Sequence, residues 1–398
     1  MLRSRYFQSY AFWHWGEGLQ TVLFTWYMTF HANLSASEIG FYQALVLSPF
    51  LIFAIAGGAL SDRIGPGRSY VVSTAVFAAV LICYGAVDHH VGFVPELFFL
   101  YCVAAGILSA ISNPAIDTFI PGATPLSAQQ NSLLAANAHN IAKLCGTLTG
   151  LLLPVVLAVG GFGLNGGLMA LSVVFLILFL RASPVGRGPA PRNQDGVRGR
   201  TLRRLVHHYR DCPQNFDILL SSAMLGLLLV PAGYILWPLI LRERFPEHGD
   251  LIALINVSSW IGAITCTALA RRYLGTTRRP GQVSLLVWFA YALLLAALCL
   301  VGSFVAMCLI VMLMGGVKLG KAMVYGHYLE NSPVPDRALL ISVDQTAFWG
   351  LATLGTFGMG RMVDVIGLEP TILCTAGAIL ICLLGLSGRG RLPRLTMA

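Results

Sequence analysis

The stretch that decides the fold is GALSDRIGPGR, residues 58–68, a short charged turn between two long apolar runs. Residues 41–60 and residues 69–87 contain no charged side chain. Each run has about 20 residues, the length that an α-helix needs to cross about 30 Å of hydrocarbon. The turn therefore lies at a membrane surface and reverses the chain between two membrane-spanning helices.

The residue types of this turn have physical reasons. Gly65 permits backbone angles that other residues avoid, and Pro66 fixes one further angle. Arg63 and Arg68 can contact acids or lipid phosphates, and positive charge is typical of cytoplasmic turns. Positive charge alone does not explain Asp62, which can lie near the positive N-terminal end of a neighbouring helix.

The pattern G-x-L-x-D-R-x-G at residues 58–65 resembles the signature between the second and third helices of the major facilitator superfamily of transporters. The chain departs from the signature at residues 66 and 67, where the family often has basic residues. The resemblance implies that the turn holds the cytoplasmic helix ends together in one state and releases them in another. It assigns this gating role to Gly58, Asp62, Arg63, Gly65 and Arg68.

Composition extends the argument to the whole chain. Of its 398 residues, 56% are hydrophobic and 11% are charged, whereas soluble domains have about 25% charged residues. The apolar runs are much longer than the alternating strands of an outer-membrane barrel. We therefore predict an all-α membrane protein with twelve transmembrane helices. The predicted spans are residues 9–31, 39–60, 69–87, 95–119, 129–159, 164–180, 216–241, 251–270, 282–302, 305–328, 338–363 and 369–386.

One long polar stretch divides the spans. Residues 182–213 are rich in Pro, Gly and Arg, which indicates a flexible or surface-lying basic linker on the cytoplasmic side. It separates a six-helix half at residues 1–181 from a second six-helix half with a short tail at residues 214–398. Two such halves are a plan of secondary transporters, with the substrate site between the halves near the midplane.

The distribution of arginine predicts the orientation. Arginines gather before the first span, in the 58–68 turn, in the linker and in the tail, whereas the predicted outer loops hold Arg242, Arg244 and Arg361. This bias places both termini in the cytoplasm, and the compact loops favour a bacterial inner membrane. The net charge of +9 is therefore topological, and we expect no nucleic-acid partner.

Ionisable residues inside the spans carry the functional hypothesis, because charge in the bilayer is costly and by default faces a cavity or a partner. All three lysines, Lys143, Lys318 and Lys321, fall inside predicted spans. Three acids also fall inside predicted spans: Glu17, Asp117 and Asp344. Lys143 with Asp117, and Lys318 or Lys321 with Asp344, are plausible partners that could serve structure alone. Lys143 is accordingly assigned as a charge partner.

Glu17 has no lysine near it in the sequence. A carboxyl group without a partner in a low-dielectric site binds a proton more readily than one in water. Glu17 is therefore the first candidate for proton coupling, followed by Asp117 and Asp344.

Helical spacing assigns further residues to a substrate cavity. Trp13, Glu17, Gln20 and Phe24 share one face of the first span, although aromatic residues also serve helix packing. The complete predicted cavity set is Trp13, Gln20, Phe24, Asn113, Tyr234, Trp237, Lys318, Lys321, Tyr325, Gln345 and Trp349.

A second resemblance concerns the fourth and fifth spans. Residues 113–121, NPAIDTFIP, and residues 131–137, NSLLAAN, are similar to the branch of the superfamily that includes the enterobactin exporter and related drug-efflux carriers. Lys143 followed by Gly146 also fits this branch, whereas residues 146–150 have Thr where the branch usually has Pro. The resemblance implies export.

The predicted function is proton-coupled export, by alternating access, of a siderophore or an amphipathic drug-like compound. The alternative is proton-coupled uptake of a siderophore or a small anionic metabolite, and a receptor without turnover is a third class. We expect no enzyme, because no nucleophile triad, HExxH or phosphate-binding loop is present. Nine scattered cysteines without a CxxC pair predict neither a metal nor another cofactor. We expect a monomer.

Overall fold

The computed structural model describes residues 4–125, 128–182, 198–273, 279–330 and 337–395. These residues are helical or form turns, and none of them is in a β-strand, which confirms the all-α prediction. Eight helical segments among them have the length and hydropathy of a membrane span. The chain forms two compact units, which are described separately below.

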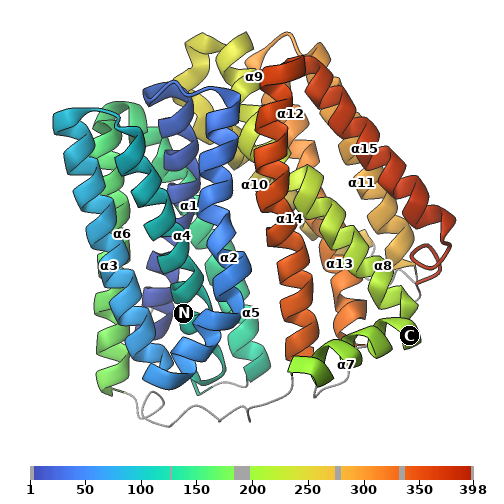
Figure 1. Cartoon of the computed structure of the whole chain (residues 1–398), viewed down its shortest axis with the longest axis horizontal. Coiled ribbons are helices and arrows are strands. Elements are labelled where there is room, and N and C mark those ends of the chain that lie inside the picture. Colours follow the sequence, from blue (N-terminus) through green and yellow to red (C-terminus); the bar gives the residue numbers. More distant parts are fainter. Residues whose placement is uncertain (1–3, 126–127, 183–197, 274–278, 331–336, 396–398) are drawn as a thin grey trace. The chain divides into compact units, whose positions relative to one another are not determined.

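The first unit comprises Met1–Leu34, Leu45–Asn193 and Asp250–Ala253. In it, α1 packs against α5 and α6, and α3 packs against α4 and α6. Its elements are α1 (Arg5–Trp26), the π-helical turn η1 (Tyr27–His31), α2 (Ala36–Ile64), α3 (Pro66–Val91), α4 (Pro95–Asp117), η2 (Ile120–Gly122), α5 (Ala128–Thr149), η3 (Gly150–Leu152) and α6 (Leu153–Ala182), coloured blue to green in Figure 1. The first residues of α2 belong to the second unit.

The second unit comprises Ser35–Ala44, Gln194–Gly249 and Leu254–Ala398. In it, α11 packs against α13 and α15, and α14 packs against α8 and η5. Its elements are α7 (Arg198–Asp211), α8 (Pro213–Met224), η5 (Leu225–Leu229), η6 (Ala232–Leu236), α9 (Trp237–Arg244), η7 (Pro246–Leu251), α10 (Ile252–Tyr273), α11 (Pro280–Ala297), η8 (Leu298–Leu300), α12 (Phe304–Met314), α13 (Val317–Glu330), α14 (Arg337–Ile366) and α15 (Leu368–Gly388).

The turn between α2 and α3 has the backbone that its sequence predicts. Gly65 has a φ of +87°, which favours glycine, and Pro66 begins α3, where a missing amide hydrogen costs nothing. Arg68 is exposed. The structure describes the backbone of residues 58–63 and not the surroundings of the Asp62 and Arg63 side chains, so the gating role of the predicted set stays a prediction.

A similar turn, with a glycine of positive φ directly before a helix, occurs between α14 and α15. Gly367 has a φ of +88° and precedes α15 directly. The Asp364 carboxylate accepts a hydrogen bond of 2.9 Å from the Ser37 amide at the start of α2. The acid of this turn therefore binds the N-terminus of a helix from another part of the chain.

Several predicted spans are interrupted. Leu157 has a φ of +59° and kinks α6 inside the predicted fifth span, before the predicted separation at residues 160–163. The seventh span contains the π turns η5 and η6 beside Pro231, and the tenth is divided into α12 and α13 at residues 315–316. The predicted linker contains a helix, α7, over part of its length.

Candidate functional site

The site in the first unit is built where α1 and α5 cross. A Cβ atom at Gly146 would lie 2.7 Å from the Leu19 amide nitrogen and would clash with the Trp15 carbonyl oxygen. A Cβ atom at Gly18 would lie 2.9 Å from the Lys143 Cα. Because both glycines lack a side chain, the two backbones approach closely, as small residues allow in membrane helices. This crossing brings the side chains of neighbouring residues on α1 and α5 together.

Glu17 and Lys143 form an ion pair at this crossing. The Lys143 ammonium nitrogen lies 3.2 Å from Glu17 Oε2, and the two side chains are 22% and 28% exposed. The Asn113 amide donates to Glu17 Oε1 at 3.4 Å. The prediction that Glu17 has no lysine partner is therefore wrong, because α5 packs against α1 although the two residues are distant in sequence. The sequence suggested a pair of Lys143 with Asp117, whereas in the structure Lys143 pairs with Glu17.

His14 completes the cluster. Its Nδ1 lies 2.8 Å from Glu17 Oε2, a distance at which a protonated Nδ1 donates to the carboxylate. Its Nε2 is buried and has no hydrogen-bond partner among the described residues. The His139 ring lies 4.2 Å from the His14 ring, centre to centre. Glu17 is thus in contact with two groups that can carry positive charge and one amide.

Asp117 lies outside this cluster. It is the last residue of α4, it is exposed, and it is within hydrogen-bond reach of the Tyr10 hydroxyl. Asn113, one turn earlier on α4, is the residue of this pair that contacts Glu17. The sequence placed the two residues on one helix face, and the packing of α1 selects between them.

The predicted cavity residues of α1 are held by other side chains. Trp13 is completely buried and donates to the Asn113 amide oxygen at 2.8 Å. The Gln20 amide donates to the Tyr101 hydroxyl at 2.5 Å and accepts from Asn165. Phe24 is 4% exposed, and its ring centre lies 5.5 Å from that of Phe98. Trp13 therefore supports Asn113, and Gln20 belongs to a hydrogen-bonded row one turn beyond Glu17.

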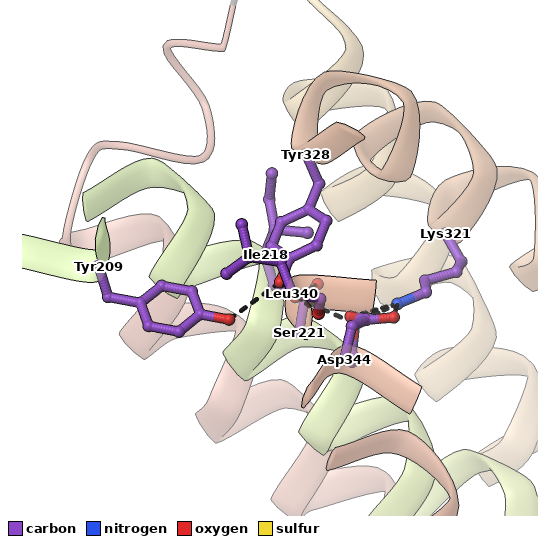
Figure 2. A network of polar contacts seen from close by, with 8 residues as sticks. Tyr209, Ile218, Ser221, Lys321, Tyr328, Leu340 and Asp344 are labelled. Atoms are coloured by element: carbon purple, nitrogen blue, oxygen red, sulfur yellow. Dashed lines mark hydrogen bonds and ion pairs between the residues drawn. The ribbon is translucent and has the colours of Figure 1, made fainter. Parts of the chain in front are cut away.

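The second unit contains a second lysine–carboxylate pair. The Lys321 ammonium lies 2.8 Å from both oxygens of Asp344, whose side chain is 1% exposed (Figure 2). The Ser222 hydroxyl donates to Asp344 Oδ1 at 2.5 Å and also contacts the Lys321 ammonium. Of the two lysines that the sequence offered as partners of Asp344, the structure selects Lys321.

A glycine crossing also accompanies this second pair. A Cβ atom at Gly226 in η5 would lie 2.8 Å from the carbonyl carbon of Phe348 in α14. The Phe348 ring in turn lies 5.9 Å from the Lys321 ammonium, and the Tyr325 ring lies 5.1 Å from it. The close approach of η5 and α14 thus places Asp344 beside the helix that carries Ser222.

The other predicted cavity residues of the second unit are dispersed. The Lys318 ammonium lies 3.2 Å from the ring centre of Trp260, which removes Lys318 from the Asp344 pair. Gln345 is exposed, and Trp349 packs edge-on against Phe348 with ring centres 5.0 Å apart. Tyr234 is half-buried in η6, and Trp237 is 8% exposed at the start of α9. The substrate-binding role of these residues stays a prediction.

Some residues of the two clusters were not foreseen. His14 is three residues before Glu17, so its helical spacing could have identified it. Ser222 and Tyr101 carry no such signal, because neutral polar residues are common in membrane helices and their partners come from other helices. Among the described residues, no group of three or more His, Cys, Asp or Glu side chains could hold a metal ion.

Comparison with known proteins identifies the fold. The family model described as Major Facilitator Superfamily matches residues 7–352. No curated protein sequence matches the chain. Among solved structures, the nucleoside transporter NupG is similar with a TM-score of 0.72 and 14% identity, covering 97% of this chain and 98% of NupG.

Two further similar structures are of POT family transporters. One, in complex with a thioalcohol conjugated peptide, has a TM-score of 0.76 and 13% identity, covering 98% of this chain and 96% of the other. Another, in complex with 5-aminolevulinic acid, has a TM-score of 0.75 and 13% identity, covering 96% and 95%. The predicted all-α fold is therefore confirmed as that of a transporter family and not of an enzyme. With a family match over most of its length, the chain belongs to the major facilitator superfamily and is a multi-pass secondary membrane transporter.

Proposed function

We propose that the chain couples the transport of a small organic molecule to protons, and that Glu17 is the residue at which proton and substrate exchange. The observation that carries the proposal is the contact of the Glu17 carboxylate with Lys143 and His14. The Glu17 side chain is 28% exposed. An ionisable group in a membrane helix that is both paired and partly exposed is suited to such exchange.

The ion pair explains how protonation would change the site. A proton on Glu17 removes the negative charge that attracts the Lys143 ammonium, 3.2 Å away. The ammonium then lacks a counter-ion, and an unpaired charge of this kind is costly. Loss of the proton restores the pair. The protonation state of Glu17 therefore decides whether Lys143 is available to a ligand.

The first candidate direction is export by proton antiport of a siderophore or an amphipathic drug-like compound. A substrate that offers a cationic or hydrogen-bond-donor group competes with the proton for the Glu17 carboxylate, and competition at one site produces exchange in opposite directions. The resemblance of residues 113–121 to the exporter branch supports this direction. Asn113, the first residue of that stretch, contacts Glu17 directly.

The second candidate is proton-coupled uptake of a siderophore or a small anionic metabolite. It is favoured by Lys143, because an anionic group would bind the ammonium best after Glu17 has taken up a proton. Proton and substrate would then bind together and move in the same direction. The charge of the substrate thus decides between the two candidates.

The membrane and orientation complete the proposal. We place the protein as a monomer in a bacterial cytoplasmic membrane with both termini in the cytoplasm, which the distribution of arginine supports. The nucleoside, peptide and 5-aminolevulinic acid named for the similar structures are not adopted as substrates, because 13–14% identity shows the fold alone.

The test uses purified protein in liposomes that contain a pH-sensitive dye. Siderophores, cationic amphiphiles and small carboxylates are applied as gradients, and proton movement is recorded for the wild type, Glu17→Gln and Glu96→Gln. Glu96 is an exposed carboxylate in the first turn of α4 and serves as the matched control. We expect proton movement with one substrate class in the wild type and the control, and its loss in Glu17→Gln.

The sign of the proton movement decides the direction. Movement opposite to the substrate supports export by antiport, and movement with the substrate overturns antiport in favour of uptake. Full transport by Glu17→Gln with an unchanged pH dependence would refute the role of Glu17. Substrate transport by the wild type without proton movement would refute proton coupling altogether.

A further inference from the structure

A second carboxylate of the first unit lies far from the Glu17 cluster and has no role in the mechanism above. Asp88 is in the last turn of α3, and its side chain is 2% exposed. Helix α1 ends in the π-helical turn η1, which carries Tyr27 and His31. Single π turns are frequent at functional sites. This one brings Tyr27 and His31 to Asp88.

The contacts of Asp88 are specific. His31 Nε2 lies 3.2 Å from Asp88 Oδ2, and the Tyr27 hydroxyl donates to Asp88 Oδ1. The Tyr27 and Tyr84 hydroxyl oxygens are 2.7 Å apart. His31 is 38% exposed and is therefore the member of the cluster that reaches the surface. A proton from water can enter through His31 and arrive at a carboxylate that is itself buried.

The position of Asp88 on its helix makes this arrangement informative. The C-terminal end of a helix carries partial negative charge, so a carboxylate in the last turn is disfavoured. Burial adds to this cost unless hydrogen-bond donors or a proton compensate. Tyr27 supplies one donor, and His31 supplies a second donor only in the right tautomer or when protonated. The cluster is therefore suited to holding a proton.

A row of polar groups leads from this cluster towards Glu17. The Tyr84 ring stacks on the Tyr101 ring with centres 4.6 Å apart, and the Tyr101 hydroxyl accepts from Gln20. Gln20 lies one helical turn from Glu17 on α1. At 1.5 Å per residue, the 14 positions between Glu17 and His31 span about 21 Å along the helix axis. The two clusters thus lie at different heights along α1.

We propose that His31 and Asp88 form a second proton-binding site, which takes up and releases a proton during the transport cycle; this rests on the proposed proton coupling at Glu17. In the first step, the His31 imidazolium gives the proton on Nε2 to Asp88 Oδ2, and both groups become neutral. The reverse transfer, from Asp88 Oδ2 to His31 Nε2, restores the carboxylate and the imidazolium, and His31 then returns the proton to water.

The surroundings of Asp88 contain few other titratable groups. Tyr27 and His31 face it from η1, and Tyr84 faces it from its own helix. From α4, Tyr101 lies behind Tyr84, and α6 contributes the Phe162 ring against Tyr84. The neighbouring groups His89, His90 and Glu96 are exposed. A pH dependence that arises here therefore reports the His31–Asp88 pair, which His90→Gln can control.

The test separates proton-driven transport from substrate counterflow, since counterflow exchanges labelled for unlabelled substrate without net proton movement. Both are measured in liposomes for the wild type, Asp88→Asn, His31→Gln and His90→Gln, while the pH is varied on each side in turn. We expect Asp88→Asn and His31→Gln to lower proton-driven transport by about tenfold or more, as loss of a proton-transfer group does. Counterflow and the His90→Gln control should stay within about twofold of the wild type.

The outcomes distinguish this inference from the proposed function. Wild-type protein that moves no protons refutes the proposed function. Wild-type protein that moves protons, together with His31→Gln and Asp88→Asn variants that move them at the same rate, refutes the second proton site alone. An equal loss of counterflow and proton-driven transport in His31→Gln would also refute the second proton site, because such a loss would show a structural role. The His31→Gln variant is expected to fold, since His31 is partly exposed.

Discussion

The strongest quantitative prediction concerns the ion pair of Glu17 and Lys143. At 3.2 Å, Coulomb's law gives about 5 kcal/mol for an effective dielectric constant of about 20 and about 1 kcal/mol in bulk water. The side chains are 28% and 22% exposed, so the site lies between these limits. We expect a coupling free energy of about 2–3 kcal/mol between the two residues.

A double-mutant cycle measures this coupling. Thermal or denaturant unfolding in detergent is followed for the wild type, Glu17→Gln, Lys143→Met and the double variant. Lys143→Met alone leaves the Glu17 carboxylate without its counter-ion and should be costly, whereas the same change in the Glu17→Gln background should cost less by the coupling energy. Lys318→Met is the matched control, since its ammonium lies over Trp260 in the second unit.

The control should be additive with Glu17→Gln to within about 0.5 kcal/mol. If Lys143→Met destabilises the Glu17→Gln protein as much as it destabilises the wild type, the two charges do not interact. Protonation of Glu17 would then not release Lys143.

Two further predictions concern contacts that position the charged pairs. Gly146→Ala should destabilise the protein by about 1–3 kcal/mol through overpacking and should reduce transport, because its Cβ would clash with the Trp15 carbonyl. Gly163→Ala should do neither, because its Cβ meets nothing within 4 Å. Equal unfolding midpoints for the two variants would contradict the close crossing of α1 and α5. Tyr209→Phe removes the 2.9 Å hydrogen bond from α7 to the Tyr328 hydroxyl and should lower the free energy of unfolding by about 1 kcal/mol. The Tyr328 hydroxyl in turn donates to the Leu340 carbonyl oxygen, one turn before Asp344 (Figure 2). Burial raises the pKa of Tyr209, so the stabilisation by its hydroxyl is fully present below the ordinary tyrosine pKa and is lost only as the pH rises through the higher folded-state pKa. The loss of unfolding free energy in Tyr209→Phe should therefore be the same at pH 6 and at pH 8. A loss that disappears at pH 8 would contradict this hydrogen bond.

The fold was accessible from the sequence because its signals are local. The glycine at position 65 and the apolar runs on either side of it each depend on a few neighbouring residues, and the structure reproduces the reversal of the chain at Gly65, although residues 58–64 continue α2. The linker was predicted less well. Its basic composition suggested a flexible or surface-lying segment, but residues 198–211 form a helix in which Tyr209 contacts α13.

The site was less accessible because its contacts join distant helices. Lys143 is 126 positions after Glu17, so only the packing of α5 on α1 makes them partners. Asp88 was overlooked for a different reason: the predicted span ended at Val87, whereas α3 continues to Val91 and buries Asp88. From the sequence alone, a carboxylate at the edge of an apolar run is predicted to lie in a loop. The structure shows that a tyrosine and a histidine from another segment contact it.

The exposure of the two lysine–carboxylate pairs assigns them different roles. Both lysine side chains are 22% exposed, but Glu17 is 28% exposed and Asp344 only 1%. Asp344 binds Lys321 through both oxygens and accepts from Ser222, so every partner would have to move before a proton or a substrate could replace them. Glu17 has Lys143 and His14 at one oxygen and Asn113 at the other, but its side chain is 28% exposed. A group that exchanges protons must be reached by water, and a charge held on all sides acts as a fixed support. We therefore infer that Glu17 exchanges protons during transport while the Lys321–Asp344 pair, with Ser222, holds α8, α13 and α14 in register.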